Sequence, residues 1–316
     1  MTEKTSVSQE YVPQTPEAHE PQLPEPHKTK NSVTSVQHKQ RRSHRKEVRE
    51  WITAIVQLAG VVAVVVSLVG VIVNIQQFNQ QQQTADRNAL DQRRQTTLDT
   101  YIDQMSTLLL QYNLAHSKPG DSVQAVAQAR TYTALRNIDP ARQGTLIRFL
   151  WGANLIEGPD PVINLSMVNI ANADLSYAYL QTINLSGALS MSVNFHESDL
   201  TGADLINAHL DNANLSGSFL IGANLTLAHL TGANISGKDT DLTGANLTNA
   251  NLAGANLAGA NLTNVNLSGV YTNLTGADLS GANLTGANLT NATLKGANLS
   301  GATLTGATMP DGSKHP

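Results

Sequence analysis

Two histidines at matched positions are the residues of this sequence best suited to chemistry. His209 and His229 each come directly before a leucine of a five-residue pattern, and they lie 20 residues, or four repeats, apart. Imidazole nitrogens bind transition metals and exchange protons near neutral pH. Two ligands make a weak metal site, however. The alternative is that both histidines are surface residues at variable positions of the repeat.

Other groups that catalysis or cofactor binding would need are missing from the sequence. It contains no cysteine, which excludes disulfides, thiolate nucleophiles and cysteine-ligated zinc or iron–sulfur sites. It also has no nucleophile elbow, no phosphate-binding loop and no cluster of histidines and carboxylates at metal-ligand spacing. We therefore expect a protein that is not an enzyme and that holds no cofactor.

The five-residue pattern that carries the histidines fills the second half of the chain. A representative run, from Thr243 to Leu262, is TGANL TNANL AGANL AGANL. An apolar residue returns every five positions from Leu165 to Met309, except at Ser190 and at two steps of seven residues. A helix would scatter this period around its surface, and a strand would alternate it between two faces. The pattern therefore predicts a coil whose repeats all turn Ala and Leu towards the axis.

These repeats resemble the pentapeptide-repeat family, whose motif is A(D/N)LXX. The resemblance covers residues 163–309 and implies a β fold, a right-handed quadrilateral parallel β-helix. It also implies four repeats per coil, so that residues 20 apart stack and His209 lies directly beside His229. The central apolar residues would form a core ladder that includes Leu165, Leu175, Leu185, Phe195, Leu205, Leu215, Leu225, Leu247, Leu257, Leu284 and Leu299.

The variable residues of the repeats gather in the first coils. After Leu242 the repeats are nearly uniform in Thr, Gly, Ala, Asn and Leu. Exposed aromatic side chains are the usual anchors of a protein interface, so the first coils are where we expect a partner to bind. The candidate interaction surface consists of Tyr177, Tyr179, His196, Glu197, His209, Phe219 and His229.

An uncharged apolar run at residues 51–75 precedes the repeats. From Ile52 it spans roughly 36 Å as a helix, more than the hydrocarbon core of about 30 Å. We expect a retained single-pass membrane anchor rather than a cleaved signal peptide, because no small-x-small cleavage site follows. Six Lys and Arg residues lie shortly before the run and three shortly after it. This bias predicts a cytoplasmic N-terminus with the repeats on the opposite side, although basic residues beside an anchor can also simply bind anionic lipid headgroups.

The remaining segments support these two parts. Residues 1–50 are expected to be a disordered tail, Pro-rich and then basic. Residues 76–158 are expected to be a helical linker module, with Asp121 capping its second helix and Asp139 and Pro140 starting its third. Residues 310–316 are expected to be a flexible tail. The arginines of the module could form a basic face for nucleic acid or lipid, or a solvated surface with local ion pairs; they are Arg93, Arg94, Arg130, Arg136, Arg142 and Arg148.

We therefore predict a membrane-anchored, non-catalytic scaffold or protein-interaction module. Its partners would be membrane lipid around residues 51–75 and a protein that the sequence does not identify, with no nucleic acid. The alternative comes from the resemblance, because gyrase-binding members look like acidic rods that mimic DNA; here eight acidic residues are spread over the repeats. Self-association is also open, through the anchor or through the last coil around Leu304 and Met309.

Overall fold

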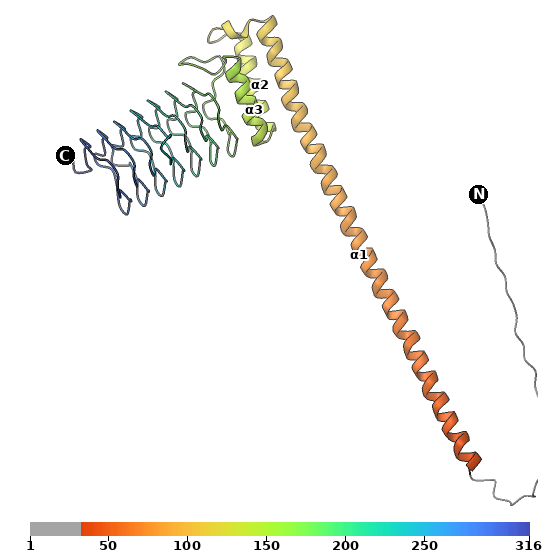
Figure 1. Ribbon diagram of the computed structural model, residues 1–316. Coiled ribbons are helices and arrows are strands. Elements are labelled where there is room, and N and C mark those ends of the chain that lie inside the picture. The colour runs from red at the N-terminus through yellow and green to blue at the C-terminus, as the bar shows by residue number, and fades with distance from the viewer. Residues whose placement is uncertain (1–32) are drawn as a thin grey trace, which may run out of the picture. The chain divides into compact units, whose positions relative to one another are not determined.

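The computed structural model describes the backbone of residues 33–316 and the side chains of residue 39 and residues 41–316. The chain forms two compact units, Met1–Gln81 and Gln82–Pro316. Helix α1 (Val33–Gln111) contributes to both, and the short helix η1 (Leu114–His116), α2 (Ser122–Asn137) and α3 (Pro140–Gly152) follow it. The repeats then form a stack of coils that runs to the C-terminus (Figure 1).

The first unit contains the predicted anchor within α1. Its apolar side chains are exposed, and the helix is long and apolar enough to cross a membrane. The helix begins at Val33, so residues 33–50 are helical where a disordered tail is predicted. The reason is that Lys, Arg, Glu and Gln are strong helix formers and this segment contains neither Pro nor Gly. The rest of the predicted tail, residues 1–32, lies outside the described residues.

The second unit begins with the last part of α1, which packs against α2 and α3. Leu98, Tyr101 and Met105 of α1 are buried there, and the Tyr101 hydroxyl lies 2.7 Å from the Thr131 hydroxyl of α2. Arg142 of α3 pairs with Asp91 of α1 at 2.8 Å. Three helices are thus confirmed, and Arg142 makes local ion pairs instead of belonging to a free basic face.

Both predicted helix starts are confirmed, but only one has the expected side-chain cap. Asp139 Oδ1 accepts a hydrogen bond from the Arg142 backbone N–H at 3.1 Å, at the start of α3. Asp121 occupies the equivalent position before α2, yet its carboxylate accepts from the Lys118 backbone N–H at 2.7 Å. Asp121 therefore holds the preceding loop rather than the helix.

Helices α2 and α3 of the predicted helical linker module cover the first coil. A first coil has no preceding coil, and its carbonyl groups need donors from elsewhere. Side chains of α2 and α3 supply them. Gln128 donates to Asn164, Tyr132 to Ser166, Gln143 to Asn169, and Arg148 to both Asp174 and Ser176, at 2.7 to 3.1 Å. One hydrophobic core runs from the helices into the coils.

At Gly144, helix α3 lies so close to the first coil that no larger residue would fit there. A Cβ added to Gly144 would lie 2.1 Å from the Asp174 carbonyl oxygen. Gly144 therefore lets α3 lie directly on the first coil. We call the two helices that cover the coil, α2 and α3, the helical cap.

The predicted stacking of residues 20 apart is confirmed in the coils. Parallel bridges join Asp174 to Asn194 and His209 to His229, and the step is 22 residues across each seven-residue interruption, as between Phe219 and Asp241. The predicted core ladder is buried from Leu165 to Leu284, whereas Leu299 in the last coil is half-buried. Ser190 lies in the core in place of a leucine, and its hydroxyl has no partner.

Each repeat ends in a tight turn that closes one side of the coil. The N–H of each repeat's alanine bonds to the carbonyl of the preceding central residue, as from Ala203 to Leu200 at 2.9 Å. The second residue inside the turn has a positive φ, such as 67° at Gly202. This is a type II turn, which favours Gly or Asn at that position.

The C-terminal end of the stack is covered less completely than the first coil. Residues 310–316 fold back, with an antiparallel bridge between Thr308 and Lys314 and a 2.8 Å hydrogen bond from His315 N to Ala307 O. The predicted flexible tail is therefore wrong, because its polar backbone pairs with the last repeat. Leu294, Leu299 and Leu304 remain only partly buried.

The capping carboxylate of Asp139 generates a prediction for acid stability. Burial raises the pKa of Asp139, but hydrogen bonds and charge from Arg142 outweigh it and hold the pKa below its ordinary value. A lowered carboxyl pKa contributes stability above the unfolded-state value of about 3.9 and loses it as the pH falls through the folded-state value. We expect Asp139→Ala to cost about 1 kcal/mol at neutral pH and to flatten the loss of stability below about pH 4.

Urea unfolding of the full chain in detergent, followed by circular dichroism from pH 2 to 7, measures both effects. Asp121→Ala is the matched control, since Asp121 occupies the same position before a helix without capping it, and its cost should be smaller. An Asp139→Ala chain that keeps the full acid sensitivity of the original would contradict the assignment.

Candidate functional site

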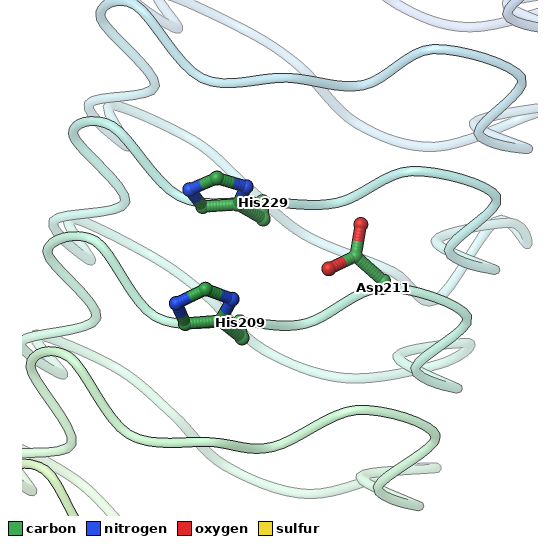
Figure 2. Close-up of side chains that lie close together, drawn as sticks. All are labelled: His209, Asp211 and His229. Carbon is green, nitrogen blue, oxygen red and sulfur yellow. The ribbon is translucent and has the colours of Figure 1, made fainter.

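The two histidines lie side by side on one face of the coils. We name this the histidine face; its bridge residues are Asn169, Leu189, His209, His229, Asn251, Asn273 and Thr293. The ring centroids of His209 and His229 are 4.6 Å apart, and the ring planes differ by only 9°. Figure 2 shows the two rings projecting in parallel from neighbouring coils. The predicted stacking of the pair is therefore present.

A third group, which sequence reasoning missed, lies beside them. Asp211 projects toward the rings from the same coil as His209 (Figure 2), and one ligand atom of each residue lies within 4.8 Å of the others. Its Oδ1 accepts a long hydrogen bond of 3.3 Å from Thr231 N. The available signal was its spacing, since residues at i and i+2 of an extended segment lie on the same side of the chain.

A second cluster lies at the corners that follow Leu175 and Phe195. The rings of Tyr177 and His196 meet edge to face with centroids 5.6 Å apart, and His196 Nε2 lies 3.3 Å from Glu197 Oε1. His196 Nδ1 lies 2.8 Å from the carbonyl oxygen of Ser216 and 2.9 Å from its hydroxyl. Both imidazole nitrogens therefore have partners.

This cluster has the residue types of a serine–histidine–carboxylate triad but not the required hydrogen bonds. A triad needs the serine hydroxyl to give its proton to the imidazole. Here the Ser216 hydroxyl donates to Asn214 Oδ1 at 2.7 Å, and the Nδ1 proton of His196 is directed to a carbonyl. The arrangement fixes the corner and orients Tyr177; it does not activate Ser216.

The first coils also hold unfavourable turn residues. Tyr177, Glu197 and Leu227 have φ values of 58°, 51° and 59°, in the left-handed region that side chains of this size rarely adopt. After Leu227 and up to Met309, every residue with a positive φ is Gly or Asn. Such strain costs on the order of 1 kcal/mol per residue and tends to mark functional segments. The irregular first coils are therefore distinguished by their backbone as well as by their side chains.

The predicted interaction surface divides into two separate parts. Tyr179 and Phe219 lie on one face with Asp199 between them, two repeats along each coil from the histidine face. Tyr179 is 67% exposed and Phe219 is 43% exposed. We call the first part the aromatic surface and define it as Tyr177, Tyr179, His196, Glu197 and Phe219. The histidine pair forms the second part.

Within the repeats, one exposed aromatic residue, Tyr271, lies outside the predicted surface. Val270 and Tyr271 occupy the second seven-residue step and are 69% and 73% exposed. The two residues form an exposed loop at this step. Their exposure follows from the insertion, because the extra residues have no inward position to fill.

Comparison with known proteins shows that the repeats of this chain are similar to those of pentapeptide repeat proteins. The family model for pentapeptide repeats matches in eight copies between residues 163 and 309. Similar solved structures include HetL of the cyanobacterium Nostoc, a pentapeptide repeat protein involved in heterocyst differentiation regulation. It is 32% identical, and the match covers 48% of this chain and 90% of HetL with a TM-score of 0.17.

Two further solved structures are similar to part of this chain. A pentapeptide repeat protein from the Arabidopsis thaliana thylakoid lumen is 28% identical, with 42% of this chain and 71% of that chain covered and a TM-score of 0.21. QnrB1, a plasmid-mediated fluoroquinolone resistance protein, is 20% identical, with 44% and 84% covered and a TM-score of 0.22. No curated protein matches the chain.

The strained corners give a testable prediction about stability. Leu227 is half-exposed with a φ of 59°, so Leu227→Gly should relieve strain and raise the free energy of unfolding by about 1 kcal/mol. Asn212→Gly is the matched control, because asparagine already tolerates the left-handed region and its replacement should change stability by only a few tenths of a kcal/mol. Urea unfolding of the two variants provides the comparison, and an equal effect in both would show that Leu227 is not strained.

Proposed function

The chain belongs to the pentapeptide-repeat family, and we propose that this member is a membrane-anchored, non-catalytic scaffold that binds a protein partner. In this proposal the repeats wind as a right-handed, four-sided β-helix. The observation that carries the proposal is the aromatic surface, whose Tyr177, Tyr179 and Phe219 side chains are exposed and whose Tyr177 and Glu197 occupy strained turns. Residues that weaken the fold and contribute nothing to its core are best explained by binding.

The aromatic surface has the composition of a protein-binding site. Tyr177, Tyr179 and Phe219 present large apolar areas, and Glu197 and Asp199 add charge beside them. Gln181 donates to Asp199 Oδ2 at 2.5 Å, which holds that carboxylate between the aromatic residues. Aromatic side chains with a polar rim are typical of the centres of interfaces.

The exposed apolar segment of α1 supports the membrane anchor. Trp51 lies at the start of that segment, and tryptophan is enriched at the lipid–water boundary. The excess of Lys and Arg before the segment favours a cytoplasmic N-terminus, with the repeats on the opposite side. The covalent link between anchor and repeats would keep the aromatic surface at the membrane.

Binding to gyrase as a mimic of DNA is the second candidate, and the acidic residues argue against it. Mimicry of DNA would need rows of negative charge, since the duplex carries one charge per about 1.7 Å. On the face that contains Asp174 and Asp278, four asparagines separate the two acids, namely Asn194, Asn214, Asn234 and Asn256. The other acids lie on different faces. A supercoiling assay with the full chain distinguishes the candidates, because inhibition of gyrase would support mimicry.

Labelling of introduced cysteines tests the anchor and its orientation together, because the chain has no cysteine of its own. Lys238→Cys lies in an exposed loop of the repeats, and the control His44→Cys lies before the anchor. We expect a membrane-impermeant maleimide to label Lys238→Cys in intact spheroplasts and to label His44→Cys only after lysis. The reverse pattern would contradict the proposed orientation, and recovery of the chain in the soluble fraction would contradict the anchor.

A further inference from the structure

We propose that His209, Asp211 and His229 bind a divalent transition-metal ion of the zinc type on the histidine face. Two imidazoles and one carboxylate are a ligand set that suits zinc, with solvent in the fourth position. One ligand atom from each of the three residues already lies within 4.8 Å of the others. The site links two neighbouring coils, since His209 and Asp211 belong to one and His229 to the next.

The nitrogens of these two imidazoles are available for a ligand. Among residues 41–316, no hydrogen bond or ion pair engages the ring nitrogens of His209 or His229, whose only ring contact is with each other. The contrast is His196, whose two nitrogens are held by Ser216 and Glu197. His209 and His229 therefore differ from His196, which lies in the same group of coils.

The fold does not require histidine at these positions. In the following coils the same face carries asparagines, and Asn251 Nδ2 donates to Thr231 Oγ1 at 3.0 Å while Asn273 Nδ2 donates to Asn251 Oδ1 at 3.2 Å. Histidines at 209 and 229 give up this ladder of side-chain hydrogen bonds. A ligand that both rings share would replace the lost link between coils.

The carboxylate of Asp211 lacks a cation. Within the described part of the chain it accepts one hydrogen bond, from Thr231 N, which is long at 3.3 Å, and no Lys or Arg pairs with it. A negative charge beside two imidazoles favours a positive ion at that point. Asp211 thus supplies both a third ligand and the charge that attracts the metal.

Only the side chains need to move for the metal to bind. Zinc–nitrogen bonds of about 2.0 to 2.1 Å at tetrahedral angles place ligand atoms roughly 3.4 Å apart, which is closer than the parallel rings allow. The backbone is fixed by hydrogen bonds from Leu210 N to His229 O at 2.7 Å and from His229 N to Ala208 O at 2.9 Å. Both rings are only half-buried, so rotation about the side-chain torsions can tilt them together.

Titration of the full chain with Zn²⁺ tests the proposal. The chain is isotope-labelled at histidine, kept in detergent and carries no affinity tag, and the imidazole resonances are followed by NMR. We expect the resonances of His209 and His229 to shift together, and their shifts to saturate when one Zn²⁺ is bound at these two residues. If both remain unmoved while other histidines respond, the proposal is overturned.

Variants give a second, independent measurement. His209→Asn with His229→Asn restores the residue that the next coil uses, and it should remove one equivalent of bound Zn²⁺ while the circular dichroism of the coils is retained. Asp211→Asn should weaken zinc binding at this site about tenfold or more. His196→Asn is the matched control and should leave the stoichiometry unchanged. An unchanged zinc stoichiometry in the double variant would contradict the site.

Discussion

The structure depends on main-chain hydrogen bonds between successive coils. Leu205 N donates to Asn224 O in the next coil, and Asn224 N donates back to Ala203 O, at 2.8 and 2.9 Å. Each coil therefore satisfies its backbone only through its two neighbours, and no coil is complete alone. The first and last coils each lack one neighbour, so part of their backbone needs hydrogen-bond partners from outside the stack. The helical cap meets this need at the first coil, where side chains such as Arg148 donate to the exposed carbonyls, and residues 310–316 meet it in part at the last coil.

The coils were predictable because their pattern is local and repeated. A leucine every five residues, with Asn before it and Gly or Asn in the turn, determines both the core and the register, and Asp139 before Pro140 marked the start of α3. The contact of the cap with the first coil had no such signal. It depends on where the side chains of Gln128 and Tyr132 meet carbonyl groups more than 30 residues away, and no spacing in the sequence specifies that meeting. Asp211 differs from these contacts, because its spacing of two residues from His209 did carry a signal for its place beside the rings.

Variation on the surface of the coils is tolerated because the interior does not depend on it. The buried Leu and Ala positions and the hydrogen bonds between coils persist through the first coils, although Tyr177 and Glu197 strain the turns there. Two kinds of irregularity result. We propose that the aromatic surface binds a protein and that the histidine face binds a metal. The later coils, with Gly and Asn at the turns, extend the stack and carry neither feature apart from the loop at Tyr271.

The central claim is that the first coils, and not the uniform ones, contact the partner. A photo-crosslinking amino acid placed at Tyr179 or at Asn283 tests it in native membranes, because both positions are bridge residues of the same face, in the first coils and near the end of the stack respectively. The account predicts a crosslinked species of higher mass from position 179 and none from position 283. Equal crosslinking at both positions, or crosslinking at position 283 alone, would contradict it.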